Sequence, residues 1–217
     1  FRSYAMNIIG GARRDINDEI EKDLREKLSI LKEDFKAIFD IYANDKTVAL
    51  RTKGVGVLTN EDAFIYGACG PHGRASGMKD DVRKVDPYCS YDDFDFKAIV
   101  QAEGDVFSRA VVRLLEIEES IKIIEQALDN IPDTPINLGM KMPKVPKGEY
   151  FSRIEAPRGE VSYYVVSNGG QTNGRVNIHV PTFKNAATVP VMLKDNTIAD
   201  AGLIVASIDP CFSCLDR

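Results

Sequence analysis

Two long stretches of helical periodicity constrain the fold more than any other feature of this 217-residue chain. Over 16–42 and 107–128, apolar residues recur at steps of three and four, which places them on one side of a helix. The first stripe consists of Ile16, Ile20, Leu24, Leu28, Leu31, Phe35, Ile38 and Tyr42. The second consists of Phe107, Ala110, Leu114, Ile117, Ile121, Ile124 and Leu128. We therefore expect two core helices, the second over about 105–129, packed antiparallel in a bundle.

The pattern changes after residue 130. Four prolines disfavour regular structure over 131–149, which we interpret as a linker or an extended wrap: Pro132, Pro135, Pro143 and Pro146. Residues 160–168 (EVSYYVVSN) and 175–181 (RVNIHVP) then alternate around a glycine-containing turn, the pattern of a β-hairpin. The sequence thus predicts a mainly helical α+β fold in a single domain 1–217, with a helical part over 1–130 and a β-containing part over 150–217.

Local signals refine this outline. Asp15, followed by Asp18, is the expected N-cap of the first long helix, and TNED at 59–62 indicates a helix over about 60–67. The glycine-rich segment 67–77 (GACGPHGRASG) and the acidic, aromatic segment 78–100 are expected to be irregular. A short helix is expected near 183–188. His72, between glycines, and His179, on a strand face, have no evident partner in the sequence.

The charge balance excludes some classes of protein. Lys and Arg number 28 and Asp and Glu number 33, so the formal net charge is −5. A generic nucleic-acid-binding protein needs a basic surface, so we expect no nucleic-acid partner. No apolar run reaches the roughly 18 residues of a membrane span, and the first residues lack the features of a signal peptide.

The segment DPCFSCLDR (209–217) contains two of the four cysteines, Cys211 and Cys214, in C-x-x-C spacing. Such a pair can bind one metal or form a redox disulfide. Too few residues follow for a thioredoxin-like helix, and a zinc ribbon needs a second pair, whereas Cys69 and Cys89 are singly placed. From spacing alone, the pair is half of a metal site.

EAPRGE (155–160) is the second segment that can carry chemistry. Pro157 fixes a bend and Gly159 permits close approach, so Arg158 is presented at a tight turn. A guanidinium there can donate directed hydrogen bonds to an anionic group. The alternative is a surface ion pair with a neighbouring glutamate.

EAPRGE, VPTFKN (180–185) and DPCFSC (209–214), in this order, resemble the C-terminal part of the large subunit of nickel–iron hydrogenases. The segment 59–88 (TNEDAFIYGACGPHGRASGMKDDVRKVDPY) is similar to energy-converting, membrane-bound hydrogenases and to the large quinone-site subunit of respiratory complex I. The resemblance covers essentially the whole chain and implies a helical bundle with a smaller β-containing part.

The resemblance implies a nickel–iron centre whose iron carries cyanide and carbon monoxide ligands. Cys211 matches the terminal nickel ligand of the C-terminal pair, and Cys214 matches the ligand that bridges the two metals. Arg158 matches the arginine near one cyanide, with Pro157 beside it in the turn. Asp209 matches an aspartate hydrogen-bonded near that arginine.

Three further residues match the surroundings of the diatomic ligands. Pro181 and Thr182 match the pair that hydrogen-bonds the second cyanide, and Val161 matches the apolar residue that packs on the carbonyl. The chemistry agrees with these matches, because bound cyanides are strong acceptors that need donors in a buried site. Heterolysis of H2 also needs a base beside the metal.

The sequence departs from the family pattern at both ends. The N-terminal C-x-x-C pair and the proton-transferring glutamate are not among these residues, and we expect them upstream of Phe1. The end at Arg217 resembles the product of C-terminal maturation. The standard uptake enzymes have histidine at that position, and arginine is a poor ligand, which weighs against an additional magnesium or iron site.

The expected function is that of an energy-converting hydrogenase catalytic subunit. It would reduce protons reversibly with electrons from ferredoxin, through an iron–sulfur small subunit. Membrane subunits would couple this reaction to ion translocation, with the chain peripheral on the cytoplasmic side of the membrane. The alternatives are a nickel-free, complex I-like quinone or acceptor subunit, which would lack the cysteine pair, and a scaffold that retains zinc or only a thiol pair.

Overall fold

The computed structural model describes residues 7–139, 145–170 and 172–216. Phe1, Pro143 and Arg217, which enter the expectations above, lie outside these ranges. The segments before the sheet form α1 (Asp18–Asn44), α2 (Lys46–Thr52), α3 (Asn60–Ile65), α4 (Gly70–Arg74), α5 (Val82–Val85), the 3-10 turn η1 (Tyr91–Asp93) and α6 (Val106–Asp129). The helices after the sheet are α7 (Pro181–Ala186), α8 (Val189–Leu193), α9 (Ile198–Ser207) and α10 (Phe212–Leu215).

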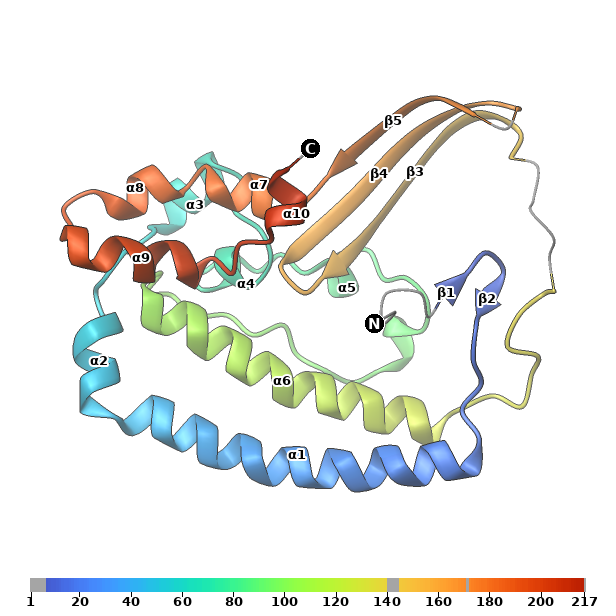
Figure 1. The fold of residues 1–217 in the computed structure, drawn as a ribbon, viewed down its shortest axis with the longest axis horizontal. Helices are drawn as coiled ribbons and strands as arrows, with labels where there is room; N and C mark the ends of the chain where they lie inside the picture. The colour runs from blue at the N-terminus through green and yellow to red at the C-terminus, as the bar shows by residue number, and fades with distance from the viewer. Residues whose placement is uncertain (1–6, 140–144, 171, 217) are drawn as a thin grey trace.

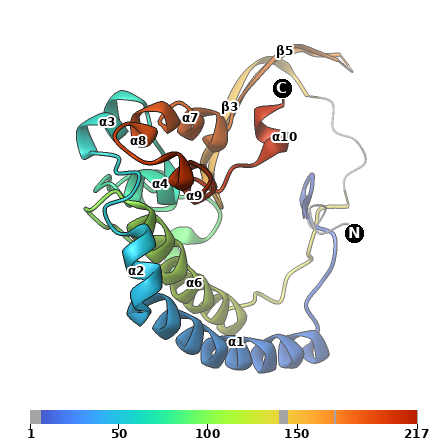
Figure 2. The same cartoon turned by 60° about the vertical axis from the view of Figure 1, so that its left-hand side comes forward.

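The two long helices predicted from periodicity pack antiparallel, α6 lying along α1 (Figures 1 and 2). The partners run in opposite order: Arg25 pairs with Asp129 at 2.9 Å, Lys32 pairs with Glu125 at 2.5 Å, and Tyr42 stacks on Phe107. Leu28, Ile121 and Leu128 are buried between the helices. The predicted antiparallel packing is confirmed.

Two details of α1 differ from the prediction. The N-cap is Asn17, whose Oδ1 accepts a hydrogen bond from the Ile20 N–H, whereas Asp15 accepts one from the adjacent Ile16 N–H. The apolar stripe is only partly covered, because a single partner helix cannot cover its full width. Leu28 and Phe35 are buried, and four members of the stripe are exposed: Ile16, Ile20, Leu31 and Ile38.

The glycine-rich segment expected to be irregular contains α4. Cys69 is its N-cap and Pro71 lies in its first turn, a position that proline favours because its missing N–H has no helical partner there. All five residues of α4 are buried. In the neighbouring segment 78–100, only α5 and η1 are regular. Helix α3 begins after the Thr59 N-cap, as predicted, and ends at Ile65.

The sheet has three antiparallel strands in the order β3 (Lys147–Ala156), β4 (Gly159–Asn168) and β5 (Asn173–His179). The hairpin β4–β5 confirms the predicted pair. Strand β3 was missed, and it begins inside the predicted linker. The sequence of β3 does not alternate between apolar and polar residues, and most of its residues are exposed. Its pairing with β4 is what makes this segment a strand. The mainly helical α+β class is confirmed.

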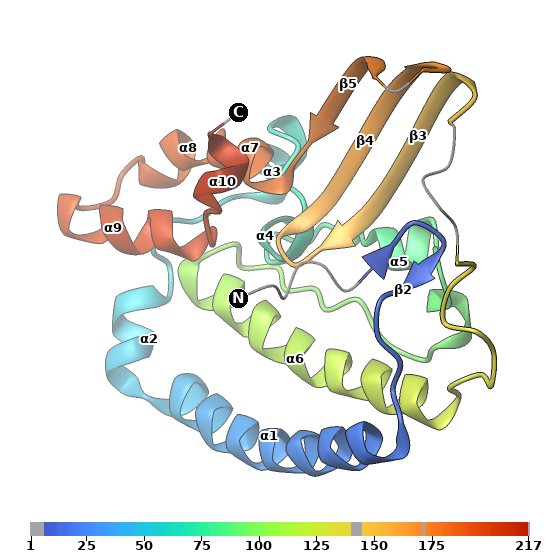
Figure 3. The same ribbon diagram turned by 45° about the vertical axis from the view of Figure 1, so that its right-hand side comes forward.

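A second, smaller hairpin stands near the start of the described chain. It joins β1 (Asn7–Ile8) and β2 (Gly11–Ala12), and the Ala12 N–H donates to the Ile136 carbonyl at 2.8 Å. The segment after α6 therefore runs beside this hairpin. The long sheet projects from the helices, and its β3–β4 end lies against α4 (Figure 3).

After the sheet, α9 packs on the N-terminal end of α6, and α8 packs on α9. An apolar cluster joins α3, α6, α8 and α9 through Leu58, Ala63, Ala68, Val106, Met192, Ile204 and Ile208. Helix α7 covers about the span predicted for a short helix, shifted toward its N-terminus by two residues. The apolar stretch 198–208 forms α9, which leads directly into the segment with the terminal cysteines.

Candidate functional site

The turn between β3 and β4 presents Arg158. Ala156 and Gly159 are the last paired residues of the two strands, so Pro157 and Arg158 form a two-residue loop. Gly159 has φ of +126°, a conformation that favours glycine. A Cβ atom on Gly159 would lie 2.8 Å from the Gly70 nitrogen, so the turn rests directly on the backbone of α4. The expected close approach at Gly159 is present.

Arg158 contacts Asp209 across 51 residues of sequence. Its Nε donates to the Asp209 carbonyl at 2.7 Å, and its Nη2 donates to the carboxylate at 3.0 Å. Asp209 has φ of +54°, a left-handed conformation that aspartate tolerates better than most residues. The two hydrogen bonds connect the hairpin turn to the segment that enters the cysteine pair.

Cys211 is the N-cap of α10, and Cys214 lies within that helix. The Cys211 N–H donates to the buried Thr182 Oγ1 at 3.3 Å, and the Cys214 N–H donates to the Cys211 carbonyl at 3.0 Å. The structure thus brings the cysteine pair to the start of α7. Pro181 is buried beside Thr182, and the half-buried Val161 lies in β4 opposite Ile154.

The surroundings of Cys211 favour the ionised form of its thiol. The pKa of Cys211 is lowered to about 7, mainly by the Ser213 hydroxyl 3.0 Å away, then by Cys214, with a further contribution from the charge of Arg158. Thiolates are the form of cysteine that binds metals. Within the described ranges, no group of three or more His, Cys, Asp or Glu side chains is arranged to hold a metal ion. The pair therefore supplies two soft donors, which suits half of a four-thiolate shell.

Sequence reasoning did not identify the polar partners of Cys69 and His72, Asn185 and Thr188, which join α4 to this site. The Asn185 side chain accepts from the Cys69 N–H at 3.0 Å and donates to the Cys69 carbonyl at 3.3 Å. Burial raises the pKa of the Cys69 thiol to about 12, so it stays protonated at neutral pH. His72 is fully buried, with Nε2 at 2.9 Å from the Thr188 hydroxyl. The only local signal was Pro71 at a helix start.

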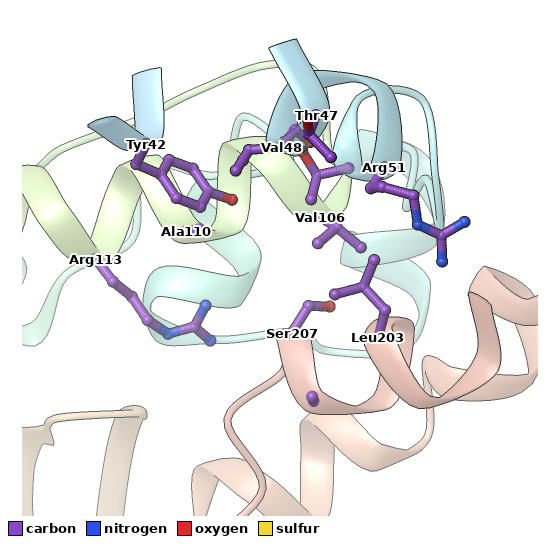
Figure 4. Close-up of a pocket in the computed structure, with 11 residues that line it drawn as sticks. Tyr42, Thr47, Val48, Arg51, Val106, Ala110, Arg113, Leu203 and Ser207 are labelled. Atoms are coloured by element: carbon purple, nitrogen blue, oxygen red, sulfur yellow. Dashed lines mark hydrogen bonds between the residues drawn. The ribbon is translucent and has the colours of Figure 1, made fainter. Parts of the chain in front are cut away.

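Two cavities lie near these residues. One, of about 430 Å³, is lined by Pro157 and Asp209 together with charged side chains of α4, α6 and β3. The other, of about 520 Å³, is mostly apolar, lies between α2, α6 and α9, and includes none of the predicted site residues. Figure 4 shows Arg113 extending from α6 toward Ser207 in this second cavity. Arg113 lines both cavities.

In the part of the chain that the structure describes, no helix combines the length and apolar character needed to cross a bilayer.

Comparison with known proteins gives several strong similarities. An NADH-quinone oxidoreductase subunit of Clostridium beijerinckii is 40% identical over 210 residues, which cover 96% of this chain and 57% of that protein. The carbon monoxide-induced hydrogenase of Rhodospirillum rubrum is 40% identical over 224 residues, covering 98% and 59%. An F(420)H(2) dehydrogenase subunit of Methanosarcina mazei is 39% identical over 215 residues, covering 96% and 58%.

The chain thus spans less than two thirds of the length of these curated relatives. The family profile described as "Respiratory-chain NADH dehydrogenase, 49 Kd subunit" matches residues 2–142 and 136–217, so it covers nearly the whole chain. The Clostridium beijerinckii NADH-quinone oxidoreductase subunit and the Rhodospirillum rubrum hydrogenase share the same identity with this chain, 40%, while most of the similar proteins are named as NADH-quinone oxidoreductase subunits. The chain belongs to the family of the 49 kDa subunit of the respiratory-chain NADH dehydrogenase, complex I.

Proposed function

We propose that this chain is the C-terminal, metal-binding part of the catalytic subunit of an energy-converting nickel–iron hydrogenase. The reaction joins two protons and two electrons to give H2, and it is reversible. Electrons would come from ferredoxin through an iron–sulfur small subunit. Membrane subunits would couple the reaction to ion translocation, with this subunit on the cytoplasmic side of the membrane. The observation that carries the proposal is the Cys211–Cys214 pair beside Arg158 and Asp209.

The donor set fits such a centre. Cys211 and Cys214 would hold the nickel–iron centre, together with two more thiolates supplied from outside these 217 residues. The lowered pKa of Cys211 supports metal binding at neutral pH without a large penalty for losing the proton. When bound, the nickel–iron centre supplies the redox chemistry of H2. The remaining contributions come from the chain's own residues.

Arg158 and Thr182 provide the donors that cyanide ligands require. Two nitrogens of Arg158 are used by Asp209, and no hydrogen bond from its Nη1 occurs among the described residues. The Thr182 Oγ1 accepts from the Cys211 N–H, which leaves its own hydroxyl proton free to donate. The half-buried Val161 of β4 and the buried Pro181 would contribute apolar surface to the site.

Asp209 has two functions in the proposal. Its contacts orient the Arg158 guanidinium, and its carboxylate is the nearest acidic group that can accept or release a proton beside that guanidinium. The Asp209 side chain is 43% exposed, so it can exchange protons with water in the adjoining cavity of about 430 Å³.

The test is metal analysis of the whole protein, purified with its upstream part and its partner subunits. About one nickel per copy of the protein and H2 evolution from reduced ferredoxin would support the proposal. Zinc in place of nickel would favour the scaffold alternative.

A second candidate is a nickel-free subunit that forms a quinone or related acceptor site. It is favoured by the name of the Clostridium beijerinckii relative, an NADH-quinone oxidoreductase. The discriminating measurement is quinone reduction by the purified complex after growth without nickel. Full quinone reduction by nickel-free protein would favour this candidate. Absence of quinone reduction in nickel-free protein, with H2 evolution that appears only when nickel is supplied, would favour the hydrogenase.

A further inference from the structure

We propose that Arg74 is a positioning residue for Arg158: it holds the β3–β4 turn in place from inside the protein. Arg74 ends α4, the short helix on which the turn rests. The role of Arg158 in turnover belongs to the proposed hydrogenase function, so the catalytic half of this inference rests on that function. The structural half, which concerns the position of the turn, is independent of it.

The guanidinium of Arg74 joins three elements at once. Its Nε donates to Glu116 of α6 at 2.9 Å, and its Nη1 donates to Glu155 of β3 at 2.9 Å. The same Nη1 donates to the Asp80 carbonyl at 2.9 Å, just before α5. A planar guanidinium fork can hold these acceptors in fixed directions, which an ammonium group cannot. Arg74 therefore sets the spacing between α6, β3 and the segment before α5.

Glu155 is the link from Arg74 to the turn. It is paired with Glu160 across the hairpin and lies three residues before Arg158. Its second carboxylate oxygen accepts from the Val82 N–H at 3.2 Å, so both oxygens are bonded. Burial raises the pKa of Glu155, and Arg74 opposes this shift by stabilising the charged form. Loss of the Arg74 contact would leave a buried carboxylate without its main cationic partner.

The other end of α4 touches the turn directly. A Cβ atom on Gly70 would lie 2.4 Å from the Gly159 Cα and 2.5 Å from the Arg158 carbonyl oxygen. The turn is thus supported at two points, by backbone contact at Gly70 and by the ion pair of Arg74 with Glu155. Two points of support fix both the position and the tilt of the turn, which a single contact does not.

The charges around Arg74 explain why an arginine can be buried there. Its side chain is 2% exposed and faces the carboxylates of Glu116, Glu155 and Asp81, the last at 3.7 Å. Asp81 is shared with Arg83, which lies 2.7 Å away. Breaking one such buried pair is strongly destabilising in other proteins, and the expected relaxation here is a shift of the β3–β4 turn.

Arg109 provides a matched control. It is also fully buried, but its three donors go to neutral acceptors: the Ser207 hydroxyl and the carbonyls of Gly104 and Gly56. None of these acceptors lies in the β3–β4 hairpin. Arg74→Lys and Arg109→Lys both keep a buried positive charge and lose the planar guanidinium. Because only Arg74 bonds to the hairpin, only Arg74→Lys should affect the turn.

The experiment compares the two variants in the full protein by hydrogen exchange and by turnover. In Arg74→Lys, the amides of 154–161 should exchange roughly ten times faster or more, while amides in α9 keep their rates. In Arg109→Lys the hairpin should be unchanged. An even increase over the whole chain in Arg74→Lys would overturn the proposal, because it would indicate only a general loss of stability.

The catalytic half is tested by a double-mutant cycle on H2 turnover per nickel. Arg74→Lys should lower turnover roughly tenfold in the native background and have little effect in the Arg158→Lys background, since both changes act through one guanidinium. Additive losses would overturn the catalytic half. If wild-type protein contains no nickel, the hydrogenase proposal fails, yet the exchange measurement still decides whether Arg74 positions the turn.

Discussion

Arg158 donates one hydrogen bond to the main-chain carbonyl of Asp209 and one to its carboxylate, at 2.7 Å and 3.0 Å. This pair connects the end of the sheet with the segment that carries the cysteines. The two segments belong to different secondary-structure elements. Asp209 has a left-handed backbone at the point where α9 ends and the chain turns toward Cys211. The pair therefore orients the guanidinium and also helps to define the path of the chain into the segment with the two cysteines.

Replacing Arg158 tests its part in turnover. Arg158→Lys keeps the charge but cannot donate both hydrogen bonds to Asp209 in the same plane. We expect H2 turnover to fall roughly 10²-fold, the scale typical of losing a positioned electrostatic group, with nickel content retained. Arg153→Lys is the control, because Arg153 lies on the same hairpin and pairs with the exposed Asp86. Unchanged turnover in Arg158→Lys would assign the residue to structure alone.

The cysteine pair should determine metal content. Cys211→Ser and Cys214→Ser each remove one of two soft donors, so both variants should lose nickel and H2 activity in the full protein. Cys89→Ser is the control, since Cys89 is exposed. The nickel content is measured by elemental analysis of the purified complex. Wild-type nickel content in Cys211→Ser would contradict the assignment of this residue as a ligand.

His72 should make the fold sensitive to acid. The Thr188 hydroxyl also lies 2.6 Å from the Asn185 carbonyl and donates to it, so it accepts from His72 Nε2–H. Burial, with the charges of Arg109 and Arg113, lowers the pKa of His72 well below 6.5. The unfolded chain then binds more protons, so this contribution to stability is present above pH 6.5 and is lost as the pH falls below it.

The expected slope is up to about 1.4 kcal/mol of unfolding free energy per pH unit below about pH 6.5. His72→Gln should reduce this slope in urea unfolding measured between about pH 7.5 and about pH 5. The chain has two histidines, and the other, His179, is exposed on β5, so His179→Gln should keep the wild-type slope. Equal slopes in wild type and His72→Gln would refute the prediction.

Gly70 and Gly159 should be important for stability, because their backbones come very close where α4 meets the β3–β4 turn. Gly70 has φ of +63°, and a Cβ there would lie 2.4 Å from the Gly159 Cα, so Gly70→Ala combines backbone strain with a clash. We expect a loss of roughly 2 kcal/mol or more in unfolding free energy. Gly202→Ala is the control, because Gly202 lies within α9 with open space around it, and alanine there should stabilise by up to about 1 kcal/mol. Similar effects of the two substitutions would show that the close approach has no energetic role.

Much of the fold could be predicted from local sequence patterns. The spacing of apolar residues determines α1, α6 and the hairpin β4–β5, because the period of a pattern reflects the local geometry of a helix or strand. Proline and glycine in PRG likewise determine the tight turn at Arg158. The spacing of Cys211 and Cys214 alone indicates a pair of donors for one metal.

Only the tertiary structure decided how these parts meet. Strand β3 depends on its partner β4, and α4 depends on burial under the hairpin, so neither has a strong local signal. The contact of Arg158 with Asp209 spans 51 residues, and that of Arg74 with Glu155 spans 81. The Arg74–Glu155 pair is buried, where an unpaired charge is expensive, whereas Arg158 and Asp209 are both partly exposed. In both cases the path of the whole chain sets which charged residues meet.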